Sequence, residues 1–233
     1  MRILPFALLL SLATAPALAQ DLSSREVIVV TGSRIQQNDY SDYQPAVGLT
    51  RKGDFLVQEV AIRGDTRDAE QRADEIKSML RDAIGIADRS DIELATGDYI
   101  LTRLTLENAN EVALQRDRRV DAQRINFLVK APLSDRSVDQ AQAAIEAFIE
   151  SVPEVGRAQM DGMGDPKLSV VGPDSYRDAI ITKVAEDAKR QASVLGDDYA
   201  VELTGLNMPV QWTPAGPGEV LLFIPYELKV IPR

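Results

Sequence analysis

The sequence predicts an α+β fold, in which about three helices pack on a mainly antiparallel sheet that includes a ferredoxin-like βαββαβ element. Three observations carry this prediction. Short segments with alternating or continuous apolar residues recur along the chain and are typical of strands. Three other segments have apolar residues at helical spacing together with capping signals. Between Phe55 and Val171 these segments follow one another in the order βαββαβ.

The first nineteen residues predict a cleavable signal peptide. Arg2 supplies a positive charge, an apolar run follows from Ile3 to Ala13, and Ala17-Leu18-Ala19 gives the small-x-small pattern that signal peptidase accepts. The apolar run is shorter than the roughly 20 residues that a membrane-spanning helix needs. We therefore expect a periplasmic protein with no transmembrane span.

Residues 20–53 are expected to form an extended N-terminal segment. Within it, residues 26–34 (EVIVVTGSR) resemble the short segment through which TonB-dependent outer-membrane receptors meet their energy-coupling protein. A receptor barrel of about 22 strands would use the whole mature chain, so this chain is too short to be such a receptor. A TonB-coupled accessory protein remains an alternative. The polar stretch 36–53 is expected to form a loop or a weak hairpin.

The α+β domain is expected over residues 54–233, and its clearest unit is a strand followed by a helix. Residues 55–63 are apolar on both faces, as in a central strand. The helix is predicted to begin near Asp65 or Thr66, with Asp68 in its first turn, and to end at Gly85. Its apolar residues recur at helical spacing: Ala69, Ala73, Ile76, Met79, Leu80 and Ala83.

The middle of the chain predicts three strands and a second helix. The strands are expected over residues 91–94, 99–106 and 120–130. The helix begins at Ser137, where Gln140 completes a capping box, and ends before Pro153. Residues 156–165 are rich in glycine and aspartate and predict a loop, which leads to a short strand over residues 168–171.

A third helix and two further strands are predicted to complete the domain. Ser175 and Asp178 form the helix cap, and Gly196 ends the helix. A strand over residues 199–203 and a turn-rich stretch over residues 207–218 precede the last strand. There, alternate residues from Val220 to Val230 are apolar, and Pro225 indicates an edge strand or a bulge.

Composition excludes several classes of function. The chain has 36 acidic and 26 basic residues and a net charge of −10, which opposes binding to nucleic acid or anionic lipid. It contains neither cysteine nor histidine. Disulfides, thiol or histidine-dependent nucleophilic catalysis and the usual zinc ligands are therefore excluded. The basic run over residues 116–119 is interrupted by Asp117 and is interpreted as a solvated connection or strand end.

Three blocks of the sequence resemble the SIMPL-domain family of exported bacterial proteins. The first is the strand and helix that begin at Phe55, with the following Gly85-Ile86 and Asp91-Ile92. The second is the alanine-bearing stretch from Tyr176 to Gly196. The third is Pro217-Gly218-Glu219-Val220, before the final strand. The resemblance spans most of residues 45–231. Thr50-Arg51-Lys52-Gly53-Asp54 stands where the family usually has a Pro-Asp pair. The resemblance implies a role in envelope maintenance or stress tolerance, and it transfers no catalytic residue.

Three local features are candidate sites. Asp161-Gly162-Met163-Gly164-Asp165 offers two carboxylates that suit Ca²⁺, but its spacing is not that of an EF-hand, so an acidic turn is the better interpretation. Asp197-Asp198 is interpreted as a solvated helix exit. Trp212 could anchor a partner, although covering one end of the sheet is the favoured interpretation.

The sequence therefore predicts no catalytic, cofactor-binding or metal-ligating residues. The favoured hypothesis is a non-enzymatic periplasmic protein that associates with itself or with an envelope partner, and that binds no nucleic acid. The alternative is a carboxylate-dependent envelope hydrolase, which requires two converging acids with one raised pKa.

Overall fold

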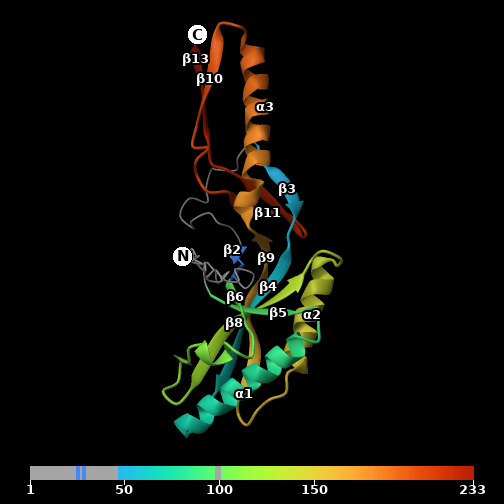
Figure 1. The fold of residues 1–233 in the computed structure, drawn as a ribbon, viewed down its shortest axis with the longest axis vertical. Helices are drawn as coiled ribbons and strands as arrows, with labels where there is room; N and C mark the ends of the chain where they lie inside the picture. Colours follow the sequence, from blue (N-terminus) through green and yellow to red (C-terminus); the bar gives the residue numbers. More distant parts are fainter. Residues whose placement is uncertain (1–24, 27, 30–46, 98–100) are drawn as a thin grey trace, which may run out of the picture.

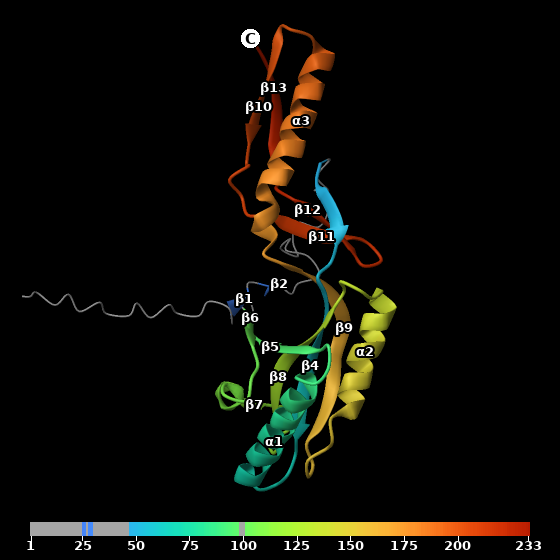
Figure 2. The same cartoon turned by 45° about the vertical axis from the view of Figure 1, so that its right-hand side comes forward.

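The computed structural model describes residues 25–26, 28–29, 47–97 and 101–233, and it confirms the α+β class. The predicted signal peptide and most of the extended N-terminal segment, including much of the receptor-like stretch 26–34, lie outside these residues. Figures 1 and 2 show an elongated molecule with two parts stacked along its long axis. We name them the α1–α2 part and the α3 part after their helices.

The α1–α2 part is built on one antiparallel sheet with the strand order β1-β6-β5-β8-β4-β9-β2. Strand β4 (Phe55–Gly64) lies between β8 (Gln123–Pro132) and β9 (Gln159–Val171), and it pairs with β8 from Phe55↔Pro132 to Gly64↔Gln123. The apolar residues on both faces of β4 therefore predicted a central strand correctly. The remaining strands of this sheet are β1 (Arg25–Glu26), β2 (Ile28–Val29), β5 (Glu93–Thr96), β6 (Leu101–Arg103) and β7 (Gln115–Arg116), which pairs with β8.

Strands β4, β5, β8 and β9 and the two helices follow one another in the predicted βαββαβ order, with β6 and β7 inserted between β5 and β8, and the helices share one core with these strands. Helix α1 (Ala69–Ala87) follows β4, and α2 (Val138–Ser151) follows β8. The capping box of Ser137 and Gln140 forms as predicted. The common core contains apolar residues from both helices and from strands β4, β5, β8 and β9, among them Val60, Ile76, Leu80, Phe127 and Ile145.

Helix α1 differs from its prediction at both ends. It begins at Ala69, because Asp68 is the N-cap and its carboxylate accepts a hydrogen bond from the Gln71 amide. It also runs through Gly85 to Ala87, so the prediction that glycine ends the helix was wrong. Ile84 and Ala87 continue the buried stripe on both sides of Gly85. This packing outweighs the cost of a glycine inside a helix, about 1 kcal/mol.

The acidic glycine-rich stretch is part of a long strand, not the predicted loop. Strand β9 covers residues 159–171 and pairs with β4, with a register shift opposite Val57 and Glu59. At this shift the buried Gln58 amide donates to the carbonyl oxygens of Met163 and Gly164, over 2.8 and 2.7 Å. The neighbouring strand and this amide supply hydrogen bonds that a local sequence pattern does not reveal.

The α3 part contains two small sheets. One has the order β11-β12-β3, from β11 (Gln211–Gly216), β12 (Glu219–Phe223) and β3 (Leu49–Lys52), and the other pairs β10 (Tyr199–Thr204) with β13 (Glu227–Pro232). The expected loop or weak hairpin therefore contains strand β3. The turn-rich stretch contains β11, and the single last strand is two strands in different sheets, interrupted around Pro225.

Helix α3 (Arg177–Leu195) packs on these sheets instead of on the large sheet. A short 3₁₀ helix, η3 (Pro173–Tyr176), precedes it, and Ser175 belongs to this turn, where its hydroxyl donates to the Gly172 carbonyl. The predicted Ser175 cap was therefore wrong. Gly196 ends α3 with φ +104°, as predicted.

Strand β9 joins the two parts without an intervening linker. Val170 is fully buried in the core of the α3 part, and Leu168 packs against the cores of both parts. Asp54, at the start of β4, accepts a hydrogen bond from the Val171 amide over 2.8 Å. None of the helices in the described ranges is long and apolar enough to cross a membrane.

Candidate functional site

The lower end of the α1–α2 part in Figure 1 carries two hollows on either side of the turn at Gly156. The first, of about 830 Å³, runs along α1, and we name it the α1 groove. The second, of about 450 Å³, lies beside the ends of β4 and β8, and we name it the arginine cavity. Its charged lining residues are Arg63, Asp65, Asp117, Arg118, Arg119 and Arg157.

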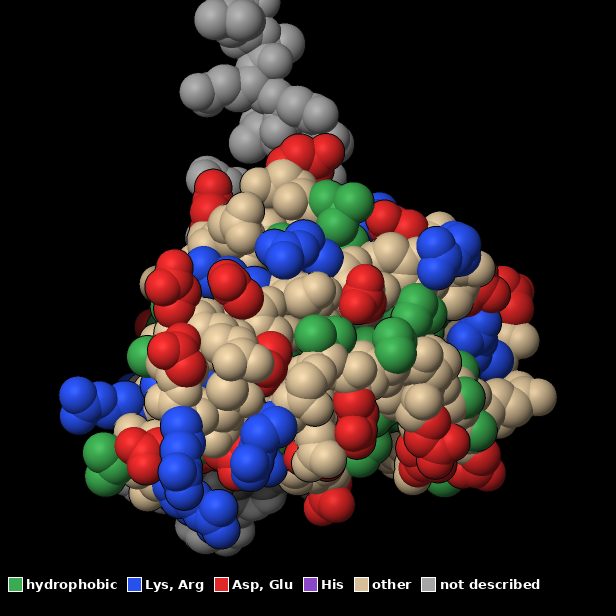
Figure 3. All heavy atoms as spheres, turned by 90° about the horizontal axis from the view of Figure 1, so that it is seen from below, with side chains coloured by type: hydrophobic (Ala, Val, Ile, Leu, Met, Phe, Trp, Pro, Cys, Tyr) green, Lys and Arg blue, Asp and Glu red, His purple; other side chains and the backbone are tan. Residues whose placement is uncertain are grey.

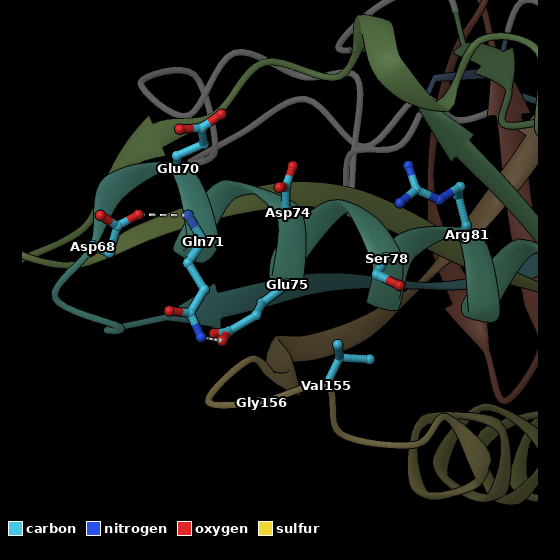
Figure 4. Close-up of a pocket in the computed structure, with 9 residues that line it drawn as sticks. All are labelled: Asp68, Glu70, Gln71, Asp74, Glu75, Ser78, Arg81, Val155 and Gly156. Carbon is cyan, nitrogen blue, oxygen red and sulfur yellow. Dashed lines mark hydrogen bonds between the residues drawn. The ribbon is translucent and has the colours of Figure 1, made fainter.

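Glu75 on α1 fixes the turn that separates the two hollows. Its carboxylate accepts hydrogen bonds from the Thr66 hydroxyl at 2.5 Å, the Gln71 amide at 2.9 Å and the Arg157 backbone amide at 3.2 Å. These donors, led by Thr66, lower the pKa of Glu75. In Figure 4, Glu75 and Gln71 point from the helix toward the turn. Glu75 thus holds Arg157 at the edge of the arginine cavity.

The guanidinium of Arg157 forms a bidentate ion pair with the carboxylate of Asp65. Its Nε and Nη2 atoms donate to the two carboxylate oxygens over 2.6 and 2.9 Å. This pair lowers the pKa of Asp65 and raises that of Arg157. Bidentate pairing fixes the plane of the guanidinium as well as its position, so Arg157 is oriented before any ligand arrives.

The other arginines near this cavity are paired loosely. Asp117 lies 3.8 Å from Arg63 Nε and 3.7 Å from Arg124 Nη1, and Arg119 Nη1 lies 3.9 Å from Asp65. These distances exceed those of good hydrogen bonds. The Nε atoms of Arg63 and Arg124 are buried and have no hydrogen-bond partner among the described residues. The ion pairs around Asp117 are therefore loose, and these two buried Nε–H groups remain without a close acceptor among the described residues.

The α1 groove contains carboxylates that do not converge. Figure 4 shows Glu70 and Asp74 pointing away from the side of α1 on which Glu75 lies. The carboxyl pKa shifts in the described part of the chain are downward, at Asp65, Glu75, Glu107 and Asp187. A general acid needs an upward shift. The groove thus offers no geometric support for the hydrolase alternative.

The acidic stretch 161–165 lies on a strand, and one of its two carboxylates is paired with an arginine. Its residues lie in and around the irregular part of β9, and Asp161 is engaged by Arg63 at 3.4 Å. In the described ranges, no three acidic side chains group closely enough to hold a metal ion. The favoured acidic turn is also wrong, because the stretch is strand. Asp197 and Asp198 are exposed in the turn after α3, as the helix-exit interpretation predicted.

Trp212 belongs to the core of the α3 part. It lies on β11, is fully buried and packs with Val184, Val210 and Leu222. The hypothesis of an exposed partner anchor is therefore wrong; the indole is buried, but it belongs to a strand of the core and does not fold back over one end of the sheet. Pairing between β11 and β12 places the indole inside, which the surrounding prolines and glycines did not indicate.

The far end of the α3 part exposes apolar side chains. Val194 and Leu195 close helix α3, Tyr199 opens β10, and Val230 and Ile231 lie on β13. Val194 is the most open, with 82% of its surface exposed. Most of the large apolar side chains that stay exposed in the described ranges lie here, and we name this group the apolar end.

The arginine cavity could not be recognised from the sequence. Residues 116–119 have the sequence pattern of a solvated connection, and Arg63, Arg124 and Arg157 are distant along the chain. Figure 3 views the molecule from this end, and it shows side chains of both charges with a group of Lys and Arg toward the lower left. Only the pairing of β4 with β8 and β9 brings these segments together.

Comparison with known proteins identifies no relative from which a function can be transferred. No family model matches the chain, and no curated protein matches it. The crystal structure of an uncharacterized conserved protein from Listeria innocua aligns with 79% of this chain and 95% of its own, at 13% identity and a TM-score of 0.15. A TM-score this low supports no conclusion about fold or function.

Proposed function

We propose that this chain is a non-enzymatic, SIMPL-like protein of the bacterial periplasm that associates with a second copy of itself through the apolar end. The exposure of Val194, Leu195, Tyr199, Val230 and Ile231 at one tip is the observation that carries the proposal. Covering apolar surface releases about 25 cal/mol per Å². In a chain of net charge −10, exposed apolar side chains gathered at one end favour an interface.

The strands beside the apolar end support pairing between copies. Strands β10 and β13 pair only with each other among the described strands, from Tyr199↔Pro232 to Thr204↔Glu227. Each therefore has an outer edge whose backbone groups pair with no described strand. Two copies can join such edges in an antiparallel arrangement with two-fold symmetry.

Light scattering coupled to size exclusion tests the association. We expect the chain without residues 1–19 to elute as a discrete oligomer, and the double variant V194S/I231S to elute as a monomer. The control is L106S, which removes an exposed apolar side chain elsewhere. A monomeric parent chain, or an oligomer that V194S/I231S leaves unchanged, would refute the role of the apolar end.

The cellular part of the proposal rests on the signal-like N-terminus and on the family resemblance. Fractionation followed by N-terminal sequencing should recover a periplasmic protein that begins at Gln20. A deletion strain should survive oxidative and detergent stress less well than the parent strain. Recovery of the uncleaved chain in the cytoplasm would contradict the location, and unchanged survival under both stresses would contradict the physiological role.

A further inference from the structure

The arginine cavity has a local charge opposite to that of the whole chain. Four arginines and two aspartates line it, whereas the chain as a whole carries a net charge of −10. The arginines come from the end of β4, the turn between β7 and β8, and the turn before β9. A fold that gathers scattered cations into one hollow concentrates anions there.

The two aspartates of the cavity offset half of its four positive charges, and Arg63 also lies 3.4 Å from Asp161 outside the lining. Asp65 is committed to Arg157 by two short hydrogen bonds, and its distance to Arg119 is 3.9 Å. Asp117 lies between Arg63 and Arg124 at 3.8 and 3.7 Å and bonds neither closely. The side chain of Arg119 is 81% exposed at the rim of the cavity.

We propose that the arginine cavity binds the phosphate group of an anionic molecule. Guanidinium groups present paired N–H donors that match phosphate oxygens, and Arg63, Arg118 and Arg119 surround one hollow. Arg157, held by Asp65 and by the Glu75-anchored turn, forms a fixed wall of the site. The cavity of about 450 Å³ exceeds a lone phosphate and accommodates a small phosphorylated compound or a lipid headgroup.

The exposed residue Val120 can distinguish the two sources of the phosphate group, a soluble compound and a lipid headgroup. Val120 follows Arg119 in the turn between β7 and β8, and 93% of its surface is exposed. An apolar side chain beside rim arginines would enter the interface of a bilayer if the phosphate belonged to a lipid. It would contribute nothing to binding a soluble phosphate compound. The arginine cavity and the apolar end lie on different parts of the molecule, so an experiment can refute one proposal and leave the other standing.

Two probes test the proposal at about 0.15 M salt, where weak surface attraction is screened. Calorimetry measures the binding of pyrophosphate, and co-sedimentation measures the binding of phosphatidylcholine vesicles that contain phosphatidylglycerol. The test variant is R118Q/R119Q. The control R89Q/R116Q removes the same charge from exposed positions that do not line the cavity. Thermal unfolding verifies that both variants fold like the parent.

We expect R118Q/R119Q to weaken binding about tenfold and the control to weaken it less than about twofold. Binding of pyrophosphate with no effect of V120S would identify a soluble phosphate compound. Binding of vesicles that V120S also weakens would identify a lipid headgroup. The proposal is overturned if neither probe binds the parent at about 1 mM, or if both double variants weaken binding equally.

Discussion

Replacing Gly156 with alanine tests whether Glu75 holds the turn beside the arginine cavity. Gly156 has φ +60°, and an added Cβ would lie 2.3 Å from Glu75 Oε1 and 2.9 Å from its Cγ. The left-handed backbone alone costs an alanine about 1 kcal/mol. Overpacking against a side chain that three donors hold in place adds about 1–3 kcal/mol. For a protein of this size, each kcal/mol lowers Tm by about 2–4 °C.

Gly164 provides a matched control for this substitution. Its φ is +63°, and an added Cβ would meet nothing within 4 Å. G164A should therefore lower Tm by about 2–4 °C, the backbone contribution alone, and G156A should lower it by about twice that or more. Thermal unfolding followed by circular dichroism measures both values. In an E75A background the two substitutions should cost the same. Equal losses in the parent chain would refute the buttressing role of Glu75.

Three further predictions concern stability. Lys130 is buried and donates to Glu93 over 2.9 Å. E93A leaves the buried ammonium without this carboxylate and should lower the free energy of unfolding in urea by about 1–3 kcal/mol, whereas K130M removes the buried charge itself and should lower it less. A larger loss for K130M than for E93A would contradict this reasoning. Trp212, the single tryptophan, should emit as a buried indole, and its unfolding transition should coincide with that of far-UV circular dichroism; separate transitions would show that the two parts unfold independently. The pKa of Asp65 lies below its ordinary value of 3.8 because of Arg157, so the pair stabilises the fold above that value and loses this contribution as pH falls through the folded-state pKa. As the pH is lowered from about 5 to 3, the urea concentration at the midpoint of unfolding should thus fall less steeply for D65N than for the parent. Equal dependence on pH in the two proteins would exclude the Asp65–Arg157 pair as a source of acid sensitivity.

Elements with their own local signal could be predicted from the sequence. Strand β4 shows its strand character in a run of apolar residues on both faces, of which one, with Leu56, Val60 and Ile62, packs against α1 and α2. Helix α2 carries its capping box within four residues. These signals come from neighbours along the chain, so they hold whatever the rest of the fold does.

Elements that depend on distant partners could not be predicted. The glycines and aspartates of β9 favour turns locally, but pairing with β4 and the Gln58 amide impose a strand. Pro225 interrupts what is one alternating apolar pattern, and its two halves enter different sheets. The arginine cavity belongs to the same class, because Arg63, Arg119 and Arg157 meet only through sheet register.

The continuity of β9 between the two cores has a mechanical consequence. Leu168 and Val170 lie on one strand and pack into successive cores, so within the described residues a continuous strand ties the two parts together. A molecule bound at the arginine cavity and a copy bound at the apolar end would be kept at a fixed separation. The protein would then serve as a stiff spacer, whose length is set by the run of strand between its two ends.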